Sequence, residues 1–357
     1  MRALVVDDSV VVRRTVATVL AEADDIEVVT ASDGRIGLRR CAELNPDVIT
    51  LDVEMPGLTG LETLAEIRKD FPTVPVIMYS TLTARGAEAT LDALALGAVD
   101  YATKPEGAIS RDDAAEMVRQ NLLPLVKLWG KRRASTRIGT ASARRSPPLD
   151  DAVPAAPAPP PKPKTGPLRL VVVGVSTGGP AALATVMPML PENLRVPVVI
   201  VQHMPPVFTA MLAERLDGLS NISVTEAVDG EVALPGHAYI APGGKHLEVV
   251  RYGASGFSFE LTENPPENSC RPAVDVLFRT AAAAADGHLL GVVLTGMGQD
   301  GLLGARDITQ AGGEVIAQDE ATSVVWGMPG YVVRERLGRA VPLDEVARTI
   351  TGKVARQ

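Results

Sequence analysis

Short apolar runs, rich in β-branched residues, alternate with stretches of helical periodicity along residues 1–128. The runs predict five strands, at residues 4–6, 26–30, 47–51, 74–78 and 98–102, with amphipathic helices between them. Apolar strands separated by helices are typical of a parallel sheet covered by helices on both faces. The first part of the chain therefore predicts an α/β domain with five strands.

The same alternation returns in the second half of the chain. Apolar runs at 168–173, 196–201, 237–241 and 289–294 predict buried strands, and helical patterns surround residues 181–189, 208–216 and 274–284. Between about residues 222 and 263 the turn signals Asp229-Gly230, Pro235-Gly236 and Pro242-Gly243-Gly244 follow one another closely, which predicts an antiparallel excursion. This half predicts a second, doubly wound, Rossmann-like α/β domain.

A proline-rich segment separates the two halves. Residues 145–167 contain nine prolines and no periodic apolar pattern, as expected for an extended polyproline spacer. Just before it, residues 127–145 carry seven Lys or Arg and no acid, a run that we interpret as the solvated flank of the linker rather than an arm for nucleic acid or anionic lipid. The predicted domains are 1–128 and 168–351, with a linker at 129–167 and a tail at 352–357.

Composition narrows the possible functions. A length of 357 residues favours two domains, and 46% hydrophobic with 22% charged residues is ordinary globular composition. The 35 Lys and Arg against 43 Asp and Glu give a net charge of -8, which disfavours nucleic acid as the main partner. The two cysteines, Cys41 and Cys270, offer no disulfide framework or zinc spacing and are expected to be packed thiols.

No signal-peptide core or membrane span is expected. Acidic residues follow the first six, and no apolar stretch approaches the roughly 18 residues that a span requires. We therefore expect a cytoplasmic protein without direct membrane insertion.

Polar residues cluster at the ends of the first five strands. Asp7 and Asp8 end the first strand, Asp52 the third, and Ser80 and Lys104 follow the fourth and fifth. Singly, each Asp is usually a turn or helix-cap residue. Because parallel strands end at one edge of the sheet, the carboxylates should meet there and repel one another unless a cation joins them. A Mg²⁺ ion together with Lys104 would supply that balance and leave Asp52 as a nucleophile toward a phosphoryl group.

This set, with Val-Glu-Met-Pro-Gly after Asp52, Ser80-Thr81 and Tyr101-Ala-Thr-Lys104-Pro105, closely resembles the receiver domain of two-component response regulators. The resemblance implies a flavodoxin-like sheet in the order 2-1-3-4-5 and a phospho-acceptor role for Asp52. It also implies that Mg²⁺ is held by Asp7, Asp8, Asp52 and the Glu54 carbonyl, that Lys104 contacts the phosphoryl oxygens, and that Ser80 and Tyr101 form the switch pair.

In the second half, Ser176, His203 and Asp300 each follow a predicted buried strand. Singly they would be a helix cap, a structural histidine and a turn residue. If the strands are parallel, however, the three side chains share one edge. There His203 can take the Ser176 proton while Asp300 orients the imidazole, which is the chemistry of a nucleophilic serine. Residues 174–178 also match G-x-S-x-G, although the order Ser, His, Asp differs from that of α/β-hydrolases. The backbone amides of Thr177 and Met297 are candidates for an oxyanion hole.

Five segments then resemble the chemotaxis protein-glutamate methylesterase family, CheB. They are Gly174-Val-Ser-Thr-Gly-Gly-Pro180, Gln202-His203-Met204, Ala241-Pro-Gly-Gly-Lys-His246, Arg271-Pro-Ala-Val-Asp-Val-Leu-Phe278 and Thr295-Gly-Met-Gly-Gln-Asp300-Gly301. The resemblance implies hydrolysis of γ-glutamyl methyl esters, and deamidation of glutamines, on chemoreceptors. Ser176 would be the nucleophile, His203 the base and Asp300 the orienting acid, with no cofactor in this half. The histidine kinase CheA would be the phosphodonor, and an unphosphorylated receiver would cover the catalytic cleft.

Two positions depart from the family pattern: Cys270 stands where members often carry His, and the linker is longer and richer in proline. A nucleophilic role for Cys270 would need a base beside it and is not favoured. His237, His246 and His288 lack metal-ligand spacing and are read as structural or surface residues.

Two other function classes stay open at this point. Residues 174–180 could form a phosphate-binding loop of a nucleotide sensor, although they lack G-x-G-x-x-G and Walker spacing. A DNA-binding output domain is the second alternative, but the second half shows no helix-turn-helix pattern.

Overall fold

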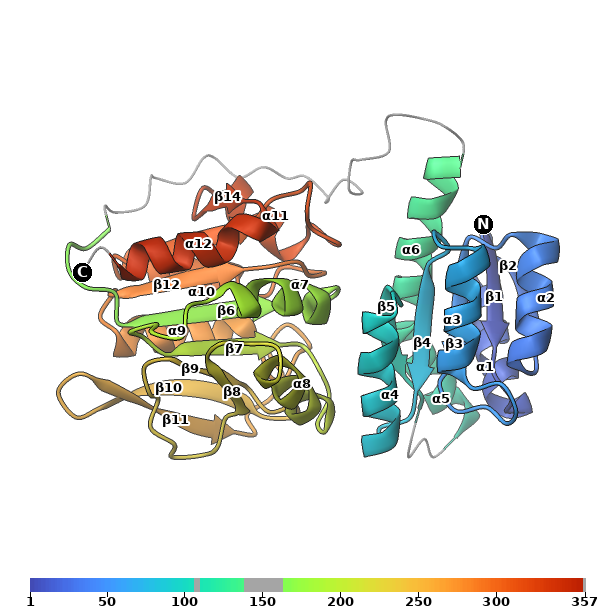
Figure 1. The fold of residues 1–357 in the computed structure, drawn as a ribbon, viewed down its shortest axis with the longest axis horizontal. Coiled ribbons are helices and arrows are strands. Elements are labelled where there is room, and N and C mark those ends of the chain that lie inside the picture. Colours follow the sequence, from blue (N-terminus) through green and yellow to red (C-terminus); the bar gives the residue numbers. More distant parts are fainter. Residues whose placement is uncertain (106–109, 138–162, 356–357) are drawn as a thin grey trace. The chain divides into compact units, whose positions relative to one another are not determined.

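The computed structural model describes residues 1–105, 110–137 and 163–355, and the chain divides into two compact units, 1–147 and 148–357, which we describe separately (Figure 1). Among the helices of these residues, none combines the length and the apolar character that crossing a bilayer requires.

The first unit is a parallel sheet of five strands in the order β2-β1-β3-β4-β5, as predicted. Its strands are β1 (Arg2–Val6), β2 (Glu27–Ala31), β3 (Val48–Asp52), β4 (Val76–Ser80) and β5 (Asp100–Thr103). The buried residues of β3 and β4 confirm the expectation from their apolar runs, and both strands extend to the polar residues Asp52 and Ser80. Asp52 and Ser80 thus lie at the carboxyl ends of neighbouring strands.

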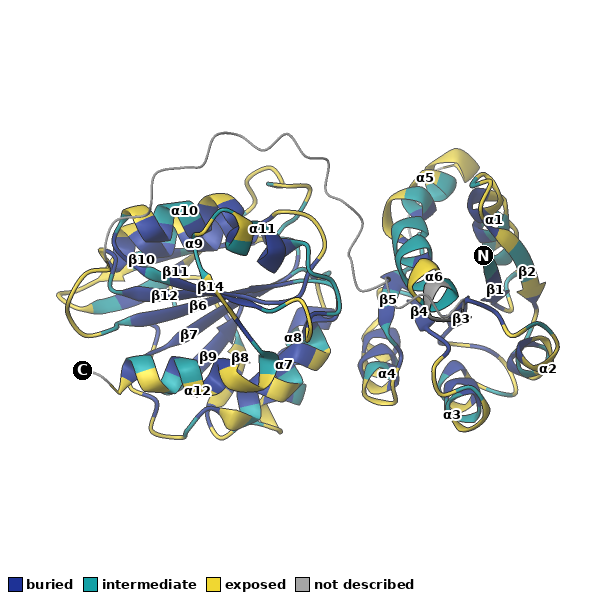
Figure 2. Ribbon diagram, turned by 90° about the horizontal axis from the view of Figure 1, so that it is seen from above, coloured by how far each residue is buried: buried dark blue, intermediate teal, exposed yellow. Residues whose placement is uncertain are grey.

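Helices cover both faces of this sheet. Helices α2, α3 and α4 lie on one face, and α1, α5 and α6 lie on the other (Figure 2). Their bounds are α1 (Val10–Ala21), α2 (Gly34–Leu44), α3 (Gly60–Asp70), α4 (Ala84–Ala95), α5 (Arg111–Asn121) and α6 (Leu123–Arg137). Side-chain caps start five of them, at Ser9, Asp33, Thr59, Thr83 and Ser110, each satisfying a backbone amide that the helix leaves free.

Helix α6 continues the first unit beyond residue 128, the boundary expected from sequence, and takes in part of the basic run. Val126 is buried, and the Trp129 indole donates to Asp100 Oδ2 at 3.5 Å. A Cβ on Gly130 would lie 2.6 Å from the Met1 sulfur, so the helix approaches the sheet closely at this point. The basic side chains thus share their helix with residues that pack on the sheet, which their composition alone did not reveal.

The second unit is built on a parallel sheet of seven strands in the order β14-β13-β12-β6-β7-β9-β8. Its strands are β6 (Leu170–Val175), β7 (Val198–Gln202), β8 (Ser223–Glu226), β9 (His237–Ile240), β12 (Leu289–Val293), β13 (Glu314–Gln318) and β14 (Arg339–Val341). The predicted antiparallel excursion is confirmed: β10 (His246–Tyr252) and β11 (Gly256–Thr262) form an antiparallel hairpin, and an isolated antiparallel bridge joins Val232 to Ser258. Strands β8 and β9 pair in parallel at one edge of the main sheet.

Helices again form two layers around the sheet. Helices α9, α10 and α11 cover one face, and α7, α8 and α12 cover the other (Figure 2). They span α7 (Gly179–Val186), α8 (Phe208–Asp217), α9 (Val274–Ala284), α10 (Leu302–Gln310), α11 (Met328–Arg334) and α12 (Leu343–Val354), with a short 3₁₀ turn at Met187–Met189. The doubly wound fold is therefore confirmed, and α12 runs past residue 351, the end expected from sequence.

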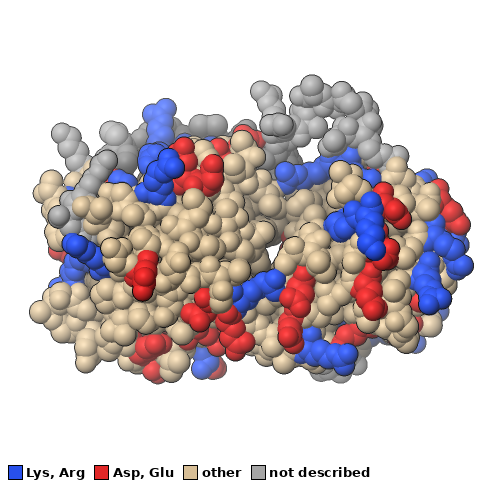
Figure 3. Space-filling view, viewed as in Figure 1, with Lys and Arg blue, Asp and Glu red and all other residues tan. Residues whose placement is uncertain are grey.

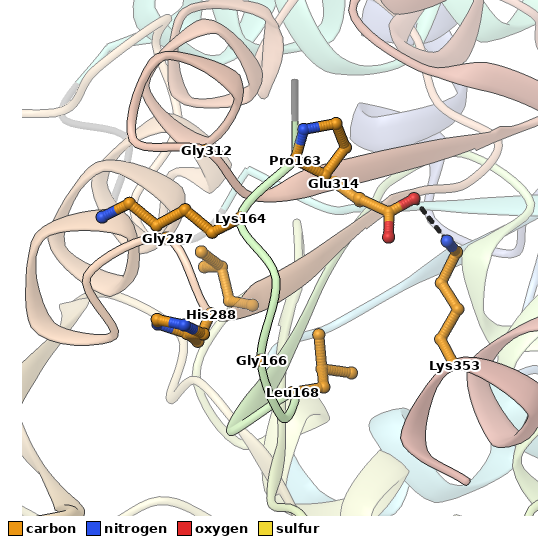
Figure 4. A pocket seen from close by; sticks show the side chains of 10 residues that line it. Pro163, Lys164, Gly166, Leu168, Gly287, His288, Gly312, Glu314 and Lys353 are labelled. Carbon is orange, nitrogen blue, oxygen red and sulfur yellow. Dashed lines mark hydrogen bonds and ion pairs between the residues drawn. The ribbon is translucent and has the colours of Figure 1, made fainter. Parts of the chain in front are cut away.

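A small cavity of about 120 Å³ lies where the described chain enters the second unit (Figure 4). Lys164, which we expected in the linker, donates its amide to the Gly312 carbonyl at 2.8 Å and its ammonium to Asp286 Oδ1 at 3.0 Å. Lys353 pairs with Glu314 at another side of the cavity. Because β12 and β13 begin here, the cavity lies at the opposite edge of the sheet from the carboxyl ends of its strands.

Charged side chains of both signs are interspersed on the face shown in Figure 3. Lys and Arg do not merge there into a continuous basic surface of the kind that a phosphate backbone requires.

Candidate functional site

The three carboxylates that were predicted to lie together at the edge of the first sheet are close neighbours in the structure. Ligand oxygens of Asp7, Asp8 and Asp52 all lie within 4.8 Å of one another. Lys104, on the loop after β5, places its ammonium 2.9 Å from Asp7 Oδ2 and 2.7 Å from Asp52 Oδ2. The ammonium thus pairs with two of the three carboxylates, and the hard oxygen donors of all three fit a Mg²⁺ ion that would offset the remaining charge.

Burial sets the protonation of this cluster. It raises the pKa of Asp52 to about 6, although Lys104 opposes the shift, and it raises the pKa of Asp7 as well. Burial would lower the pKa of Lys104, but its two carboxylate partners outweigh that effect and raise it. Near neutral pH Asp52 is therefore mostly ionised, as a nucleophile must be.

The other residues predicted for this edge lie on β4, on β5 and on the loop after β3. The Glu54 amide donates to Asp52 Oδ1 at 3.2 Å, which fixes the loop after β3. The buried Ser80 hydroxyl donates to the Gly86 carbonyl at 3.0 Å. Tyr101 is half-buried against the core, and burial raises the pKa of its phenol. Ser80 is the last residue of β4, whereas Tyr101 lies near the start of β5 and pairs in register with Met78.

In the second unit, parallel pairing brings the serine and the histidine to one edge. Val175 is the register partner of Gln202, so Ser176 and His203 are the next residues on neighbouring strands. The His203 amide donates to the Val175 carbonyl at 3.1 Å, and the Ser176 amide donates to the Thr295 carbonyl at 3.0 Å. Ser176 therefore lies between the loop of His203 and the loop that follows β12.

Ser176 does not cap the helix that follows it. Helix α7 begins after Gly178, whose φ of 76° is left-handed, and no side chain caps it. This contradicts the reading of Ser176 as a helix cap, and the half-buried serine stays at the sheet edge.

Asp300 holds His203 by one ring nitrogen. Asp300 Oδ2 lies 2.7 Å from His203 Nε2, and because a carboxylate only accepts, Nε2 carries the proton. Asp300 is 3% exposed and also accepts backbone amides from Val274, Asp275 and Gly301, at 2.7 to 3.0 Å. Burial would raise the pKa of Asp300, but His203 and these amides outweigh it and lower the pKa. The carboxylate therefore stays ionised beside the imidazole.

His203 presents its other nitrogen, Nδ1, to the site. Burial disfavours the imidazolium, yet the hydrogen bonds with Asp300 and Cys270 raise the pKa of His203 to about 9. Since Nε2 is occupied by Asp300, Nδ1, which contacts the Cys270 sulfur, is the ring nitrogen that could accept a proton. This orientation was not predictable from the spacing of the residues.

Cys270 departs from the expectation of an ordinary packed thiol. Its sulfur is 3.6 Å from His203 Nδ1, and the residue is half-buried. The base that a reactive Cys270 would need is therefore beside it. Cys41, in contrast, is fully buried, and burial raises the pKa of its thiol to about 11.

Asn268 is a site residue that the sequence did not reveal. Its amide Nδ2 donates to Asp300 Oδ1 at 3.0 Å and to Asp275 Oδ2 at 2.9 Å, which links two buried carboxylates. Its φ is 52° and that of Ser269 is 63°, so two successive non-glycine residues adopt the left-handed conformation. Only the tolerance of Asn for this conformation could have hinted at such a turn.

The amides predicted for an oxyanion hole lie in loops around Ser176. Within the described residues, neither the Thr177 amide nor the Met297 amide donates to another group. Thr295 Oγ1 donates to the Thr177 carbonyl at 2.9 Å, which ties the two loops together. A Cβ on Gly296 would come 2.9 Å from the Ser176 Cβ, so only glycine permits this close approach.

The predicted structural role of His246 is confirmed, because it is buried between Pro265 and Ala273.

Comparison with known proteins gives a consistent match. Residues 171–350 match the CheB methylesterase family model and residues 3–116 match the response regulator receiver domain. A protein-glutamate methylesterase/protein-glutamine glutaminase of Trichodesmium erythraeum is 48% identical over 99% of both chains. One of a Nocardioides species is 50% identical over 100% of this chain and 96% of the relative. This chain belongs to the CheB methylesterase family.

A solved structure agrees with the family assignment. The catalytic domain of Thermotoga maritima CheB methylesterase is 43% identical, with a TM-score of 0.50 over 52% of this chain and 97% of that chain. The sequence-based family prediction is thus confirmed, and the protein is a methylesterase that also carries a receiver domain. Neither a nucleotide sensor nor a DNA-binding output is needed to account for the second unit.

Replacing Asn268 with alanine in this CheB methylesterase should lower kcat about tenfold with little change in KM, because a hydrogen bond to the charged Asp300 is lost at an exposed turn. Steady-state hydrolysis of a glutamate methyl ester peptide checks this. Asn268→Asp keeps a residue that accepts the left-handed backbone but sets a third carboxylate beside Asp300 and Asp275, so its kcat should fall further. Equal kcat in all three proteins would contradict a positioning role.

The pH dependence of kcat/KM should follow His203. The serine chemistry expected from the sequence needs a neutral imidazole as its base, so kcat/KM should rise with pH toward a midpoint near 9. The titratable groups that face the ring are Asp300 and Cys270, with Asp275 behind Asp300. Cys270→Ala removes one of the contacts that raise this pKa, so its midpoint should lie at lower pH. The pH profiles of kcat/KM for the wild type and Cys270→Ala, measured in the presence of a chelator, test this. The same midpoint in both proteins would refute an effect of Cys270 on the pKa of His203.

Proposed function

We propose that this CheB methylesterase is a phosphorylation-activated serine hydrolase that removes methyl groups from γ-glutamyl methyl esters, and amide groups from glutamines, on chemoreceptors. The observation that carries the proposal is the orientation of His203, whose Nε2 is fixed by Asp300 while Nδ1, in contact with the Cys270 sulfur, faces away from that carboxylate; Ser176 follows the neighbouring strand. A histidine, a buried ionised acid and a half-buried serine thus share one strand edge.

The reaction follows from these positions. As Ser176 Oγ bonds to the ester carbonyl carbon, its proton passes to His203 Nδ1, and Asp300 stabilises the resulting imidazolium. Methanol leaves with that proton and an acyl group stays on Ser176. Water then attacks the acyl group with His203 as base and releases the glutamate carboxylate. Ammonia takes the place of methanol when the substrate is a glutamine.

The amides of Thr177 and Met297 support the proposed oxyanion hole. They belong to loops on either side of Ser176 and donate to no other described group. Each donor that meets the oxygen of the tetrahedral intermediate contributes about 2.7 to 4 kcal/mol to transition-state stabilisation. Ester and amide pass through the same kind of intermediate, so one set of donors serves both substrates.

Substrates and phosphodonor are proposed from the family. The relatives are named for protein glutamate and protein glutamine. From membership of the CheB family we take methylated chemoreceptors as the proposed substrate class. The receiver domain implies a histidine kinase as phosphodonor, and in chemotaxis this is CheA.

In the receiver, Asp52 is the proposed phospho-acceptor. Asp7, Asp8, Asp52 and the Glu54 carbonyl would hold Mg²⁺, which supplies charge neutralisation to the phosphoryl oxygens. Lys104, already 2.7 Å from Asp52, is placed to contact the same oxygens. The added dianion would then bias the positions of Ser80 and Tyr101.

Methanol release from methylated chemoreceptor, with and without acetyl phosphate, tests substrate class and activation together. We expect methanol in both conditions and a higher rate with the phosphodonor. Absence of methanol from a folded protein would overturn the proposed activity, whereas equal rates would overturn only the activation.

Asp52→Asn should keep the basal rate of methanol release and lose its stimulation by acetyl phosphate, so that the ratio of the two rates falls to unity. The amide keeps the shape of the side chain but cannot form an acyl phosphate. Asp92→Asn, on the receiver helix α4, is the matched control and should respond as the wild type does. Undiminished stimulation of Asp52→Asn would refute the role of Asp52.

A further inference from the structure

The catalytic histidine has a soft ligand beside it that the proposed reaction does not use. Cys270 Sγ lies 3.6 Å from His203 Nδ1, and ligand atoms of Cys270, His203 and Asp300 all fall within 4.8 Å of one another. We propose that Cys270 and His203 form a chelating site for a soft divalent cation such as Zn²⁺, and that the bound cation reversibly inhibits the enzyme. The binding site rests on geometry alone, whereas the inhibition rests on the proposed function.

The separation of the two atoms suits a single metal ion. In tetrahedral sites Zn²⁺ lies about 2.3 Å from a cysteine sulfur and about 2.0 to 2.1 Å from a histidine nitrogen, which sets these two ligands about 3.6 Å apart. Sγ and Nδ1 have this spacing without any movement of the backbone. The ion would take the place of the thiol proton between them, and water would fill the remaining positions.

Asp300 orients His203 through Nε2, the ring nitrogen that does not face Cys270. A metal-bound histidine usually donates its other N–H to a carboxylate, which fixes the tautomer and strengthens the ligand. His203 Nε2 and Asp300 Oδ2 form this contact at 2.7 Å. Asp300 already accepts from three backbone amides and from Asn268, so it is placed to orient the histidine and not to bind the ion itself.

The cysteine is held in place before any ion binds. Cys270 and Glu267 exchange two backbone hydrogen bonds, at 2.9 and 3.1 Å, which close a tight turn. Arg279 on helix α9 clamps Glu267 through both of its carboxylate oxygens, at 2.9 and 3.1 Å. Asn268, within the same turn, donates to Asp300. The turn therefore positions both the Cys270 thiol and the Asp300 carboxylate that orients His203.

The ligand types select the cation. A thiolate with an imidazole favours Zn²⁺ and its neighbours over Mg²⁺, whereas the oxygen cluster of Asp7, Asp8 and Asp52 favours Mg²⁺. The two sites therefore discriminate between cations by ligand chemistry. A cation on Nδ1 occupies the lone pair that would accept the Ser176 proton, and hydrolysis should stop while it is bound.

Co²⁺ provides a binding test that does not depend on activity, because a cobalt–thiolate bond gives a near-ultraviolet charge-transfer band that oxygen ligands do not give. The chain has two cysteines, so Cys41→Ser is the matched control for Cys270→Ser. Under reducing conditions with excess Mg²⁺, the full-length wild type and Cys41→Ser should show the band, saturating at one equivalent and displaced by Zn²⁺. Cys270→Ser should not show it, and Asp300→Asn should need about 10- to 100-fold more Co²⁺.

The inhibition is measured separately. Cys270→Ser should raise the Zn²⁺ concentration for half-inhibition at least about tenfold, because loss of a metal ligand weakens binding at least as much as loss of a group that orients a ligand. The rate of each protein is compared with the rate of the same protein treated with a chelator. No band in the wild type, or an equal band in Cys270→Ser, would overturn the site. A normal band without any esterase activity would instead point to failure of the proposed function, and a band without inhibition would overturn the inhibitory role.

Discussion

Ser176→Ala should reduce methyl ester hydrolysis by about 10⁶-fold, because loss of the nucleophile in a hydrolase of this kind removes the whole covalent route. The residual rate would come from the oxyanion donors and from substrate binding. Ser176 is half-buried, and its backbone is fixed by the Thr295 carbonyl, so removal of one oxygen should leave the fold unchanged. Methanol release measured over hours, with thermal unfolding as the check on folding, gives the result.

Ser255→Ala is the matched control for this change. Ser255 lies exposed in the turn between β10 and β11, away from the carboxyl ends of the sheet strands, and its substitution should not alter the rate. Full activity in Ser176→Ala would contradict the assignment of the nucleophile.

Asp300→Asn should lower kcat about 10⁴-fold with KM little changed. The neutral amide no longer stabilises the imidazolium, and it can present an N–H where His203 Nε2 donates. The new amide must also satisfy the backbone amides of Val274 and Asp275, which point at the present carboxylate. Single-turnover kinetics on a methylated peptide separate the chemical step from binding.

Asp275→Asn is the appropriate control for Asp300→Asn. Asp275 is buried beside Asp300 and accepts from Gly304 and Asn268, but it does not contact His203. Loss of its charge should change kcat far less than the change at Asp300. If both variants lose activity equally, the effect belongs to folding of the loop and not to orientation of the base.

The strands that could be predicted from the sequence are those whose apolar residues are buried on both faces of a sheet. Strands β3 and β6 lie within the centre of parallel sheets and read as continuous apolar stretches. The residues at their carboxyl ends then located Asp52 and Ser176, and the apolar run of β7 located His203. Strands β13 and β14 were not predicted, because β13 follows a Gly-Gly turn and contains polar ends, and the exposed residues of β14 interrupt any apolar pattern.

The details of the hydrolase site could not be read from the sequence. Cys270 and His203 are far apart in the chain, and their contact depends on a turn with left-handed Asn268 and Ser269. Such a turn is not encoded by glycine, so the tolerance of Asn for the left-handed conformation was its one weak local signal. Which nitrogen of the His203 ring faces Asp300 is also a tertiary property, since it depends on the side from which Asp300 approaches the ring.

The most direct test of the central claim is to trap the acyl-enzyme. Full-length protein is mixed with a methylated receptor peptide, quenched in acid during the first turnover, digested and analysed by mass spectrometry. We predict that the glutamyl acyl group appears on Ser176 at the same rate as methanol is released, and that it is absent from the His203→Ala protein. An acyl group on Cys270, or methanol released with no acyl group on the protein, would contradict the account.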